Sequence, residues 1–331
     1  MTQVDAPRTP AKARTSGAGG AGPGPGAWRR GRPLAALSLL LALFMALHAQ
    51  VPNRIGNVGS LLETFLPWFG LVIPLLLVAA AWRRSASAAI ALLLPIAVWL
   101  NLFGGLMIDK SHPGSDLTVV SHNVGADNPD PVGTARDLAA AGADVLALEE
   151  LTPQATGAYE QELAKTYRYH TVQGTVGLWS RLPLSDTRPV TIGMDSSRAL
   201  RTTVTTRHGL LAVYVAHLGS VRVFPRNGFW TAQRDAGVRT LGAALAAERN
   251  ERVVLLGDLN GTLDDRAFAD LTSRLRSAQD AAGDGFGFSW PATSPVARID
   301  HILVRGVEPD RSWVLPATGS DHRPVAAGIS W

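Results

Sequence analysis

Three short clusters of carboxylate, amide and imidazole side chains occur in the C-terminal part of the chain. They are Gly257-Asp258-Leu259-Asn260, Arg298-Ile299-Asp300-His301 and Ser320-Asp321-His322-Arg323-Pro324, and each stands beside an apolar, strand-like run. Carboxylate oxygens hold hard divalent cations such as Mg²⁺. A histidine supported by an aspartate, together with an Asp/Asn pair, can position a water molecule and a phosphoryl group. The clusters therefore predict metal-assisted hydrolysis of a phosphate ester.

Further polar residues close earlier apolar runs. Asn123, the pair Glu149-Glu150 and His217 each end such a run. In the Gly-Asp-Leu-Asn cluster, the Asp and the Asn are two residues apart and therefore share one face of an extended strand. Polar groups gathered at the ends of central strands can converge on one site. We expect these residues to meet there.

Each of these pieces also has a plainer explanation. Glu149 and Glu150 could begin a solvated helix, and His217 could be a structural histidine whose hydrogen bonds are satisfied. Asp258 and Asn260 could form a turn, which their residue types favour. Six matching pieces in one order favour the functional interpretation over these alternatives.

The elements that must position these residues form one α/β domain. Its predicted strands are 117–120, 145–148, 176–179, 210–215, 253–256 and 299–304, and its predicted helices are 133–141, 153–165 and 231–248. Strands that are apolar throughout are typical of sheets covered on both faces. The segment 177–183 is interpreted as a structural strand and turn.

Three apolar spans precede this domain, at residues 34–49, 65–82 and 86–108. Each approaches the ~20 residues needed to cross the core of a bilayer. Because they are apolar around the whole helix, they differ from the amphipathic helices of a soluble protein, which are apolar on one face. A signal peptide is the alternative for the first span, since arginines precede it. The pattern predicts three transmembrane helices.

Basic residues set the expected orientation. Arginines precede the first span, and Arg83 and Arg84 separate the second from the third, whereas the loop between the first two spans is nearly neutral. The positive-inside rule places both basic clusters in the cytoplasm. We therefore expect a multi-pass cell-membrane protein with a disordered, basic, Gly/Pro-rich cytoplasmic tail at 1–32, a three-helix membrane anchor at 33–110 and an extracellular catalytic domain at 111–331.

Charge and cysteine content exclude several classes of function. Residues 1–110 carry ten Lys/Arg and three Asp/Glu, a formal +7, so the remaining 21 Lys/Arg and 24 Asp/Glu leave the rest at −3. A slightly acidic domain disfavours nucleic acid, whose binding depends on clustered cations. The chain has no cysteine, which excludes disulfides, thiolate metal sites and a cysteine nucleophile.

The order of Gly-Asp-Leu-Asn, Ile-Asp-His and Ser-Asp-His-Arg-Pro resembles the endonuclease/exonuclease/phosphatase (DNase I-like) superfamily over residues 117–328. With three spans in front of the domain, the chain more narrowly resembles the actinobacterial VanJ-type teicoplanin-resistance membrane proteins. The resemblance implies a four-layered α/β sandwich with two central mixed sheets flanked by helices. It also implies phosphoester hydrolysis that depends on Mg²⁺, with Mn²⁺ as a substitute.

The resemblance assigns metal ligands by motif. It makes Glu150 the principal carboxylate, with Asn123 and Asp321 nearby. The family usually has Gln before this glutamate, and here that residue is Glu149. The extra carboxylate could tighten cation binding or exchange roles with its neighbour, and the register of the motif favours Glu150.

The resemblance likewise assigns catalytic residues. Asp258 would orient or activate the attacking water, and Asn260 would hold a phosphoryl oxygen. His322, paired with Asp300, would act as general base or charge stabiliser, and His217 would donate to a non-bridging oxygen.

The expected function is that of a membrane-anchored, outward-facing phosphohydrolase. Its expected substrate is a lipid-linked phosphate or pyrophosphate of the cell envelope, with glycopeptide (teicoplanin) resistance as the consequence, and the lipid bilayer is the expected partner. The segment 221–230, rich in Arg and aromatic residues, is either a surface loop packed on the core or a lip that touches lipid. The alternatives are an extracellular nuclease, a phospholipase C-type phosphodiesterase, and a catalytically silent module that binds a lipid or an antibiotic.

Overall fold

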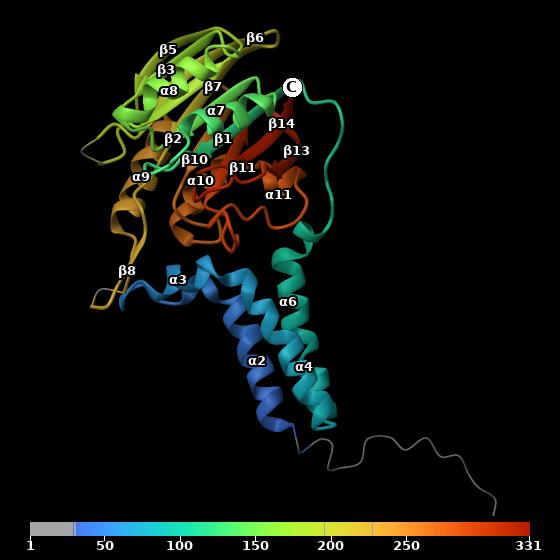
Figure 1. The fold of residues 1–331 in the computed structure, drawn as a ribbon. Coiled ribbons are helices and arrows are strands. Elements are labelled where there is room, and N and C mark those ends of the chain that lie inside the picture. Colours follow the sequence, from blue (N-terminus) through green and yellow to red (C-terminus); the bar gives the residue numbers. More distant parts are fainter. Residues whose placement is uncertain (1–28, 30, 195, 227) are drawn as a thin grey trace, which may run out of the picture.

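The fold is that of a computed structural model, which describes residue 29 and residues 31–194, 196–226 and 228–331. Almost all of the tail predicted at 1–32 therefore lies outside the described residues. Figure 1 shows an α/β body from which the helices α2, α4 and α6 extend as a bundle.

Two six-stranded sheets form the centre of the α/β body. The first has the order β13-β14-β1-β2-β4-β3, with β1 (Leu117–Asn123), β2 (Val145–Glu149), β3 (Tyr169–Gln173), β4 (Val176–Ser180), β13 (Glu308–Val314) and β14 (Val325–Ser330). The second has the order β11-β12-β10-β7-β6-β5, with β5 (Leu184–Pro189), β6 (Ala199–Thr206), β7 (Gly209–Ala216), β10 (Val253–Asp258), β11 (Arg276–Ser277) and β12 (Asp300–Arg305). Both are mixed, because β1–β2 and β10–β7 are parallel pairs and their other neighbours are antiparallel. All six predicted strands are present.

The two sheets pack face to face, and helices cover their outer faces. Val119 lies in the apolar layer between the sheets together with Val213 and Val254, whereas its neighbour Val120 packs with Leu138 beneath the helices. Successive residues of a strand are thus buried on opposite faces, which is why the strands are apolar without alternation. The predicted α/β sandwich with two mixed sheets flanked by helices is confirmed.

The helices of the α/β body are α7 (Pro131–Ala140), α8 (Pro153–Leu163), α9 (Ala232–Ala246), α10 (Ala269–Arg274) and α11 (Ala278–Ala282), with the short turn η4 (Arg266–Phe268) before α10. The Asp130 and Thr152 side chains accept hydrogen bonds from the N–H groups of the first turns of α7 and α8, and each of these helices begins with proline. The three predicted helices are confirmed to within two residues at each end.

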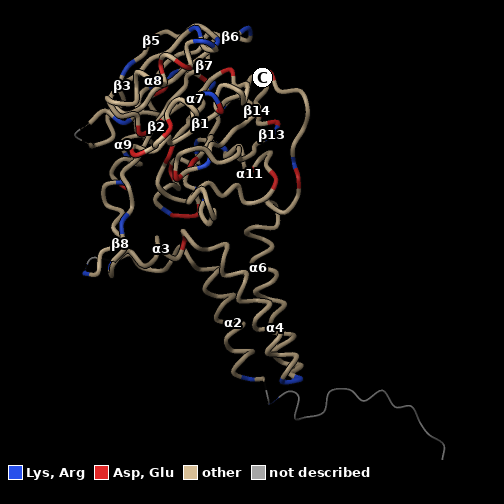
Figure 2. Tube along the Cα trace, in the orientation of Figure 1, with Lys and Arg blue, Asp and Glu red and all other residues tan. Residues whose placement is uncertain are grey.

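The N-terminal part of the chain is helical. Its elements are α2 (Arg32–Ala46), η1 (His48–Gln50), α3 (Val58–Thr64), η2 (Leu66–Leu71), α4 (Val72–Trp82), α5 (Ala86–Ala91), α6 (Leu93–Phe103) and η3 (Gly104–Met107). Figure 2 shows the bundle almost free of charge along its length, with Lys and Arg at the end farthest from the α/β body. Large apolar side chains such as Leu75 and Val78 are exposed on it.

Among the described residues, one helix, 86–107, is long and apolar enough to cross a membrane. Residues 58–64 and 66–82 pass the same criterion only together, across a bend of 69°. The break falls next to Pro67, which lacks an N–H and restricts the residue before it. The helix 32–46 is shorter than a span. The described residues therefore contain one candidate span, or two if the bent pair acts as one, and do not show the three predicted transmembrane helices.

Hydrogen bonds and ion pairs join these helices to the α/β body. Glu63 of α3 is buried and pairs with Arg266, whose Nη2 atom lies 2.8 Å from Oε1. The Trp68 indole donates to the carbonyl of Val296 over 2.8 Å. The segment 221–230 forms a hairpin of β8 (Arg222–Phe224) and β9 (Gly228–Trp230) that also contacts the segment before α3. The residues before Thr64, predicted as a loop, therefore contain a helix that docks on the sandwich.

Candidate active site

The candidate site lies where β1 of one sheet and β10 of the other end side by side. Asn123 is the last residue of β1, and Asp258 is the last residue of β10. The amide Nδ2 of Asn123 donates to Oδ2 of Asp258 over 3.0 Å. This bond joins the two sheets at the point where the predicted polar residues converge.

The Gly-Asp-Leu-Asn cluster forms a tight turn out of β10. Gly257 has φ +151°, and a Cβ atom there would lie 1.9 Å from the carbonyl oxygen of Ala216, so only glycine fits. The backbone N–H of Asn260 donates to Oδ1 of Asp258 over 2.8 Å, and its side-chain amide donates to the carbonyl of Leu218 over 3.0 Å. Both side chains are thereby fixed at the rim of the site.

His322 is held by a carboxylate and a hydroxyl. Its Nδ1 lies 2.9 Å from Oδ2 of Asp300, and Ser289 donates to the same oxygen over 2.6 Å. Ser320 accepts from the backbone N–H of His322 and donates to the carbonyl of Asn123 over 2.7 Å. These bonds leave Nε2 facing Asp258, 3.8 Å from its Oδ2.

The charge of His322 and the charge of Asp258 depend on one another. Burial lowers the pKa of His322, but the surrounding carboxylates of Asp300, Asp258 and Asp321 outweigh it and raise the pKa to about 10. Burial and the neighbouring Asp300 carboxylate raise the pKa of Asp258. An imidazolium therefore faces a carboxyl group that holds its proton more readily than an exposed aspartate does.

The two adjacent glutamates point to different places. Glu149 is fully buried, accepts a hydrogen bond from Ser121 over 2.9 Å, and has a pKa raised well above its ordinary value by burial. Glu150 has φ +61° and lines the cavity of the site, where its Oε2 accepts from the N–H of Ala126 over 2.9 Å. The left-handed backbone at Glu150 is rare outside glycine and accompanies this change of direction. The geometry therefore favours Glu150 as the carboxylate offered to a ligand.

His217 stands between the acidic residues and an arginine that the sequence did not single out. Its Nε2 lies 3.5 Å from Oε1 of Glu150 and 3.6 Å from Oδ2 of Asp258. Nη2 of Arg198 lies 2.6 Å from Nδ1 of the ring and also contacts Nε2. Burial, Arg198 and His322 lower the pKa of His217 well below its ordinary value. The ring is therefore neutral at neutral pH and can accept from the guanidinium.

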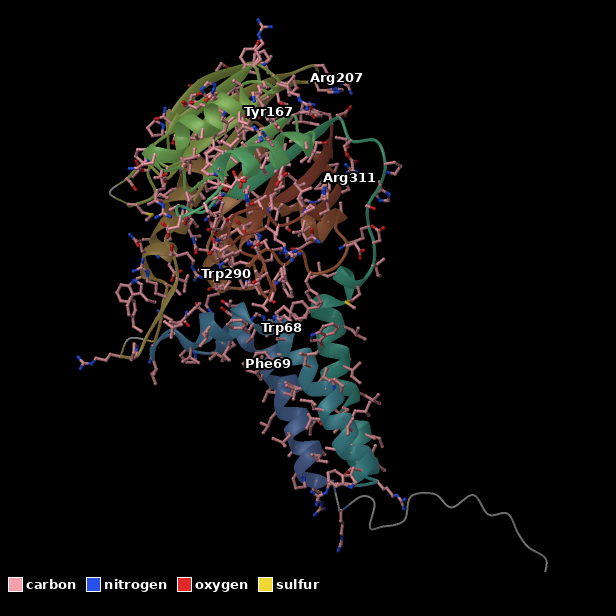
Figure 3. The ribbon with its side chains drawn as sticks, in the orientation of Figure 1. Trp68, Phe69, Tyr167, Arg207, Trp290 and Arg311 are labelled. Atoms are coloured by element: carbon pink, nitrogen blue, oxygen red, sulfur yellow. The ribbon has the colours of Figure 1, made fainter. Side chains whose placement is uncertain are left out.

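A cavity of about 380 Å³ opens over these residues. Its polar lining includes Glu150, Asp258, Asn260, Asp321 and His322. Its apolar lining comes from α3 and its C-terminal end, from the hairpin and from the loop before β12, namely Leu61, Phe65, Val221, Val223, Phe229, Trp290, Ala297 and Ile299. Figure 3 shows Trp290 of the α/β body and Trp68 of the helices on facing sides of the junction. The cavity thus has an acidic floor and an apolar wall that is partly made by the N-terminal helices.

The oxygen donors of the cavity fit a hard divalent cation. Oε1 of Glu150 has no hydrogen-bond donor other than the nearby His217 among the described residues, and its side chain is 29% exposed. Asp321 is exposed at the same cavity, and Asn123 lies beside them with its Oδ1 bonded to the N–H of Gly125. A second set of side chains close enough to share an ion consists of Asp258, Asp300 and His322. In this set, however, the hydrogen bond between Asp300 and Nδ1 of His322 already engages two of the three side chains. Carboxylate and amide oxygens suit Mg²⁺ or Mn²⁺, which retain several waters.

The structure brings all eight predicted site residues to this one region, and their roles as ligands and catalysts remain predictions. Asn123, His217 and Asp300 lie behind the cavity and contact the residues that line it. His301, the last residue of the second cluster, points away and bonds to the carbonyl of Gly261. Sequence reasoning missed Arg198 and Ser289, because neither belongs to a motif.

Comparisons with known proteins agree with this geometry. The sequence pattern of the endonuclease/exonuclease/phosphatase family matches residues 120–322, which include all eight of these residues. No curated protein matches the sequence.

Solved structures with the same fold include D. rerio TDP2 complexed with a single-strand DNA product (20% identity, TM-score 0.55, 65% of this chain and 99% of that chain). They also include a mannosyl-6-phosphatase from Bacteroides thetaiotaomicron (15% identity, TM-score 0.54, 65% and 100%). A conserved protein of unknown function from Enterococcus faecalis is similar as well (15% identity, TM-score 0.55, 65% and 99%). At such identities the likeness shows the fold alone.

Proposed function

The chain belongs to the endonuclease/exonuclease/phosphatase family, and from that premise we propose that it is a membrane-anchored phosphohydrolase acting on a lipid-linked phosphate or pyrophosphate. The choice of substrate rests on the apolar wall of the cavity. The cavity over the acidic cluster is walled by Leu61 and Phe65, at the point where the N-terminal helices meet the sandwich. A molecule whose phosphate reaches Asp258 therefore places its adjoining part against apolar side chains at the head of the helical bundle.

The residues at the site have complementary roles in this mechanism. Asp258 takes the proton of the attacking water, since its carboxyl group holds a proton more readily than usual. Asn260 orients Asp258 through its backbone N–H and its side-chain amide, and a phosphoryl oxygen in the cavity would take the place of Asp258 as acceptor of that amide. His322, kept as the imidazolium by Asp300, neutralises charge that develops on the phosphoryl group. The neutral ring of His217 donates to a second oxygen of the same group.

A divalent cation completes this set when bound. Glu150, Asn123 and Asp321 would hold it, and it would polarise the phosphoryl oxygens and lower the pKa of bound water. Mg²⁺ is the proposed ion, and Mn²⁺ is the substitute that the same oxygen donors accept.

The distribution of charge supports the proposed orientation. The basic end of the bundle lies opposite the α/β body (Figure 2), and the exposed surface between them is apolar. With the basic end in the cytoplasm, the catalytic domain lies outside the cell. Because the chain has no cysteine, a single cysteine introduced at exposed Arg226 can report its side. Labelling of intact cells by a membrane-impermeant thiol reagent supports the proposal, and labelling only after lysis contradicts it.

The proposed activity is tested with full-length protein in detergent. Phosphate release from a polyprenyl diphosphate is measured with Mg²⁺, with EDTA, and with the Asp258→Ala variant, beside a plasmid-nicking assay. The proposal predicts metal-dependent release that is lost in the variant, without nicking. Nicking without release would instead indicate a nuclease. No activity in either assay would favour a phosphodiesterase of other lipids or a binding module.

A role in glycopeptide resistance follows only if this activity is found. Expression in a susceptible host should then raise teicoplanin tolerance, and the Asp258→Ala variant should not.

A further inference from the structure

A second cavity of about 380 Å³ lies directly beside the catalytic one. Ser220 lines both. The other residues of the second cavity are Arg198, Arg222, Phe224, Trp230 and Gln233. The lining residues carry two guanidinium groups and no carboxylate. This cavity therefore has the opposite electrostatic character to the acidic floor next to it, and it suits an anion.

Arg198 is the residue that most needs a partner there. Its Nε atom is buried and has no hydrogen-bond partner among the described residues. No carboxylate in the described part of the chain lies within ion-pair distance of its guanidinium, and its only polar side-chain contact is with the neutral His217 ring. A buried donor without a hydrogen-bond partner is costly, and an anion bound at this cavity would remove that cost.

Arg222 supplies a second donor from the hairpin. It is exposed on β8, and its side chain makes no hydrogen bond or ion pair with other described residues. Both arginines are therefore available to the cavity, one from the end of the loop before β6 and one from β8. Guanidinium groups bind phosphoryl oxygens in a bidentate manner, which suits them to this task.

The His217 ring lies between residues of the two cavities, although it lines neither. Nη2 of Arg198 contacts both ring nitrogens, and Nε2 of the ring lies 3.5 Å from Oε1 of Glu150 and 3.6 Å from Oδ2 of Asp258. A phosphoryl group placed over the acidic residues can therefore have a second phosphoryl group beside it at the arginines. We propose that Arg198 and Arg222 form a subsite for the second phosphoryl group of a diphosphate ester, which makes a diphosphate the preferred substrate; this inference rests on the proposed function.

The corresponding reaction is hydrolysis of the phosphoanhydride bond. The oxygen of water forms a new bond to one phosphorus, and the bond from that phosphorus to the bridging oxygen breaks. The electron pair leaves with the bridging oxygen, on the phosphoryl group held by the arginines. One proton of water passes to Asp258 and then to solvent. The products are inorganic phosphate and a monophosphate ester.

Selectivity between two soluble substrates tests the subsite. Full-length protein is assayed with a short-chain prenyl diphosphate and with the matching prenyl monophosphate, in Mg²⁺. We expect the wild type to favour the diphosphate in kcat/KM by about tenfold or more, and Arg222→Ala and Arg198→Gln to reduce that ratio toward one. The matched control is Arg226→Ala, an exposed arginine of the same hairpin that does not line the cavity, which should keep the ratio.

Equal efficiency of the wild type on both substrates would overturn the inference, as would a proportional loss on both in Arg222→Ala. If neither substrate is turned over, the proposed function fails, and the subsite is then judged by binding alone. In EDTA, methylenediphosphonate should bind about tenfold more tightly than phosphate, and Arg222→Ala should abolish the difference. Equal binding of the two anions would overturn it.

Discussion

The Nδ1 atom of His322 lies 2.9 Å from Oδ2 of Asp300, so a carboxylate behind the cavity holds the histidine that faces Asp258 inside it. The carboxylate fixes the orientation of the ring and favours its charged form. Asp300→Asn keeps the shape and removes the charge. It should lower kcat by about 10²–10⁴-fold, as should His322→Ala.

The two residues act as a unit, so the double variant should be little worse than either single one. Circular dichroism and thermal unfolding check that each variant remains folded. Near-normal turnover by either folded single variant would remove His322 from the mechanism.

The adjacent glutamates provide a matched pair of variants. Glu150→Gln removes a carboxylate from the cavity and should weaken the Mg²⁺ dependence of activity by about tenfold or more. Glu149→Gln changes a fully buried group that accepts a hydrogen bond from Ser121 and does not line the cavity, so it should leave metal dependence nearly unchanged. Titration of activity with Mg²⁺ distinguishes them, and the reverse order of effects would assign the metal to Glu149.

The contact between the N-terminal helices and the sandwich should contribute to stability. Arg266→Ala leaves the buried carboxylate of Glu63 without its cation and should cost on the order of 3 kcal/mol. The control is Arg274→Ala, which removes an exposed ion pair with Asp270 and should cost less than about 1 kcal/mol. Thermal unfolding of the full-length protein in detergent compares them. An equal effect of both would mean that the Glu63 contact does not hold the two parts together.

Acid stability should depend on Glu248. Burial raises the pKa of its carboxyl group, but Arg201, the N–H of Asn250 and the hydroxyl of Tyr214 outweigh this and lower the pKa to about 2. Because the folded-state pKa lies below the ordinary value of 4.5, the carboxylate stabilises the fold at higher pH, and this stabilisation is lost as pH falls from about 4.5 through about 2.

We expect this loss to be at most about 3 kcal/mol. Glu248→Gln should therefore flatten the dependence of the unfolding free energy on pH in this range, as measured by denaturant titration. An unchanged slope would contradict this assignment.

The sequence predicted the strands that are apolar on both faces, and it missed the edge strands as well as the buried strands β6, which is rich in Thr, and β14, which has small residues. β5 and β13 are half exposed and carry polar residues such as Asp186 and Arg311, so their pattern does not differ from that of a loop. Three spans were predicted from apolar length alone. The length did not reveal that the chain bends by 69° beside Pro67 or that α3 turns toward the sandwich.

The site was predictable where residues end strands, and not where they meet through tertiary pairing. Asn123 and Asp258 end central strands and could be placed together from that position. Arg198 reaches the site because β6 pairs with β7 so that Ala199 lies opposite Ala216, which sets Arg198 beside His217. A local sequence pattern does not reveal the register in which β6 pairs with β7, so Arg198 was not predicted as a site residue.

The proposed function requires the cavity to act on a phosphate attached to a membrane lipid. The most direct test compares Mg²⁺-dependent phosphate release from a long-chain polyprenyl diphosphate in vesicles with release from a short-chain soluble analogue. We predict a kcat/KM at least about tenfold higher for the long chain, and a loss of this preference in the Leu61→Ser/Phe65→Ser double variant, with Leu75→Ser on the exposed bundle as control. Equal kcat/KM values for the two chain lengths, or a preference that survives removal of the apolar wall, would contradict the account.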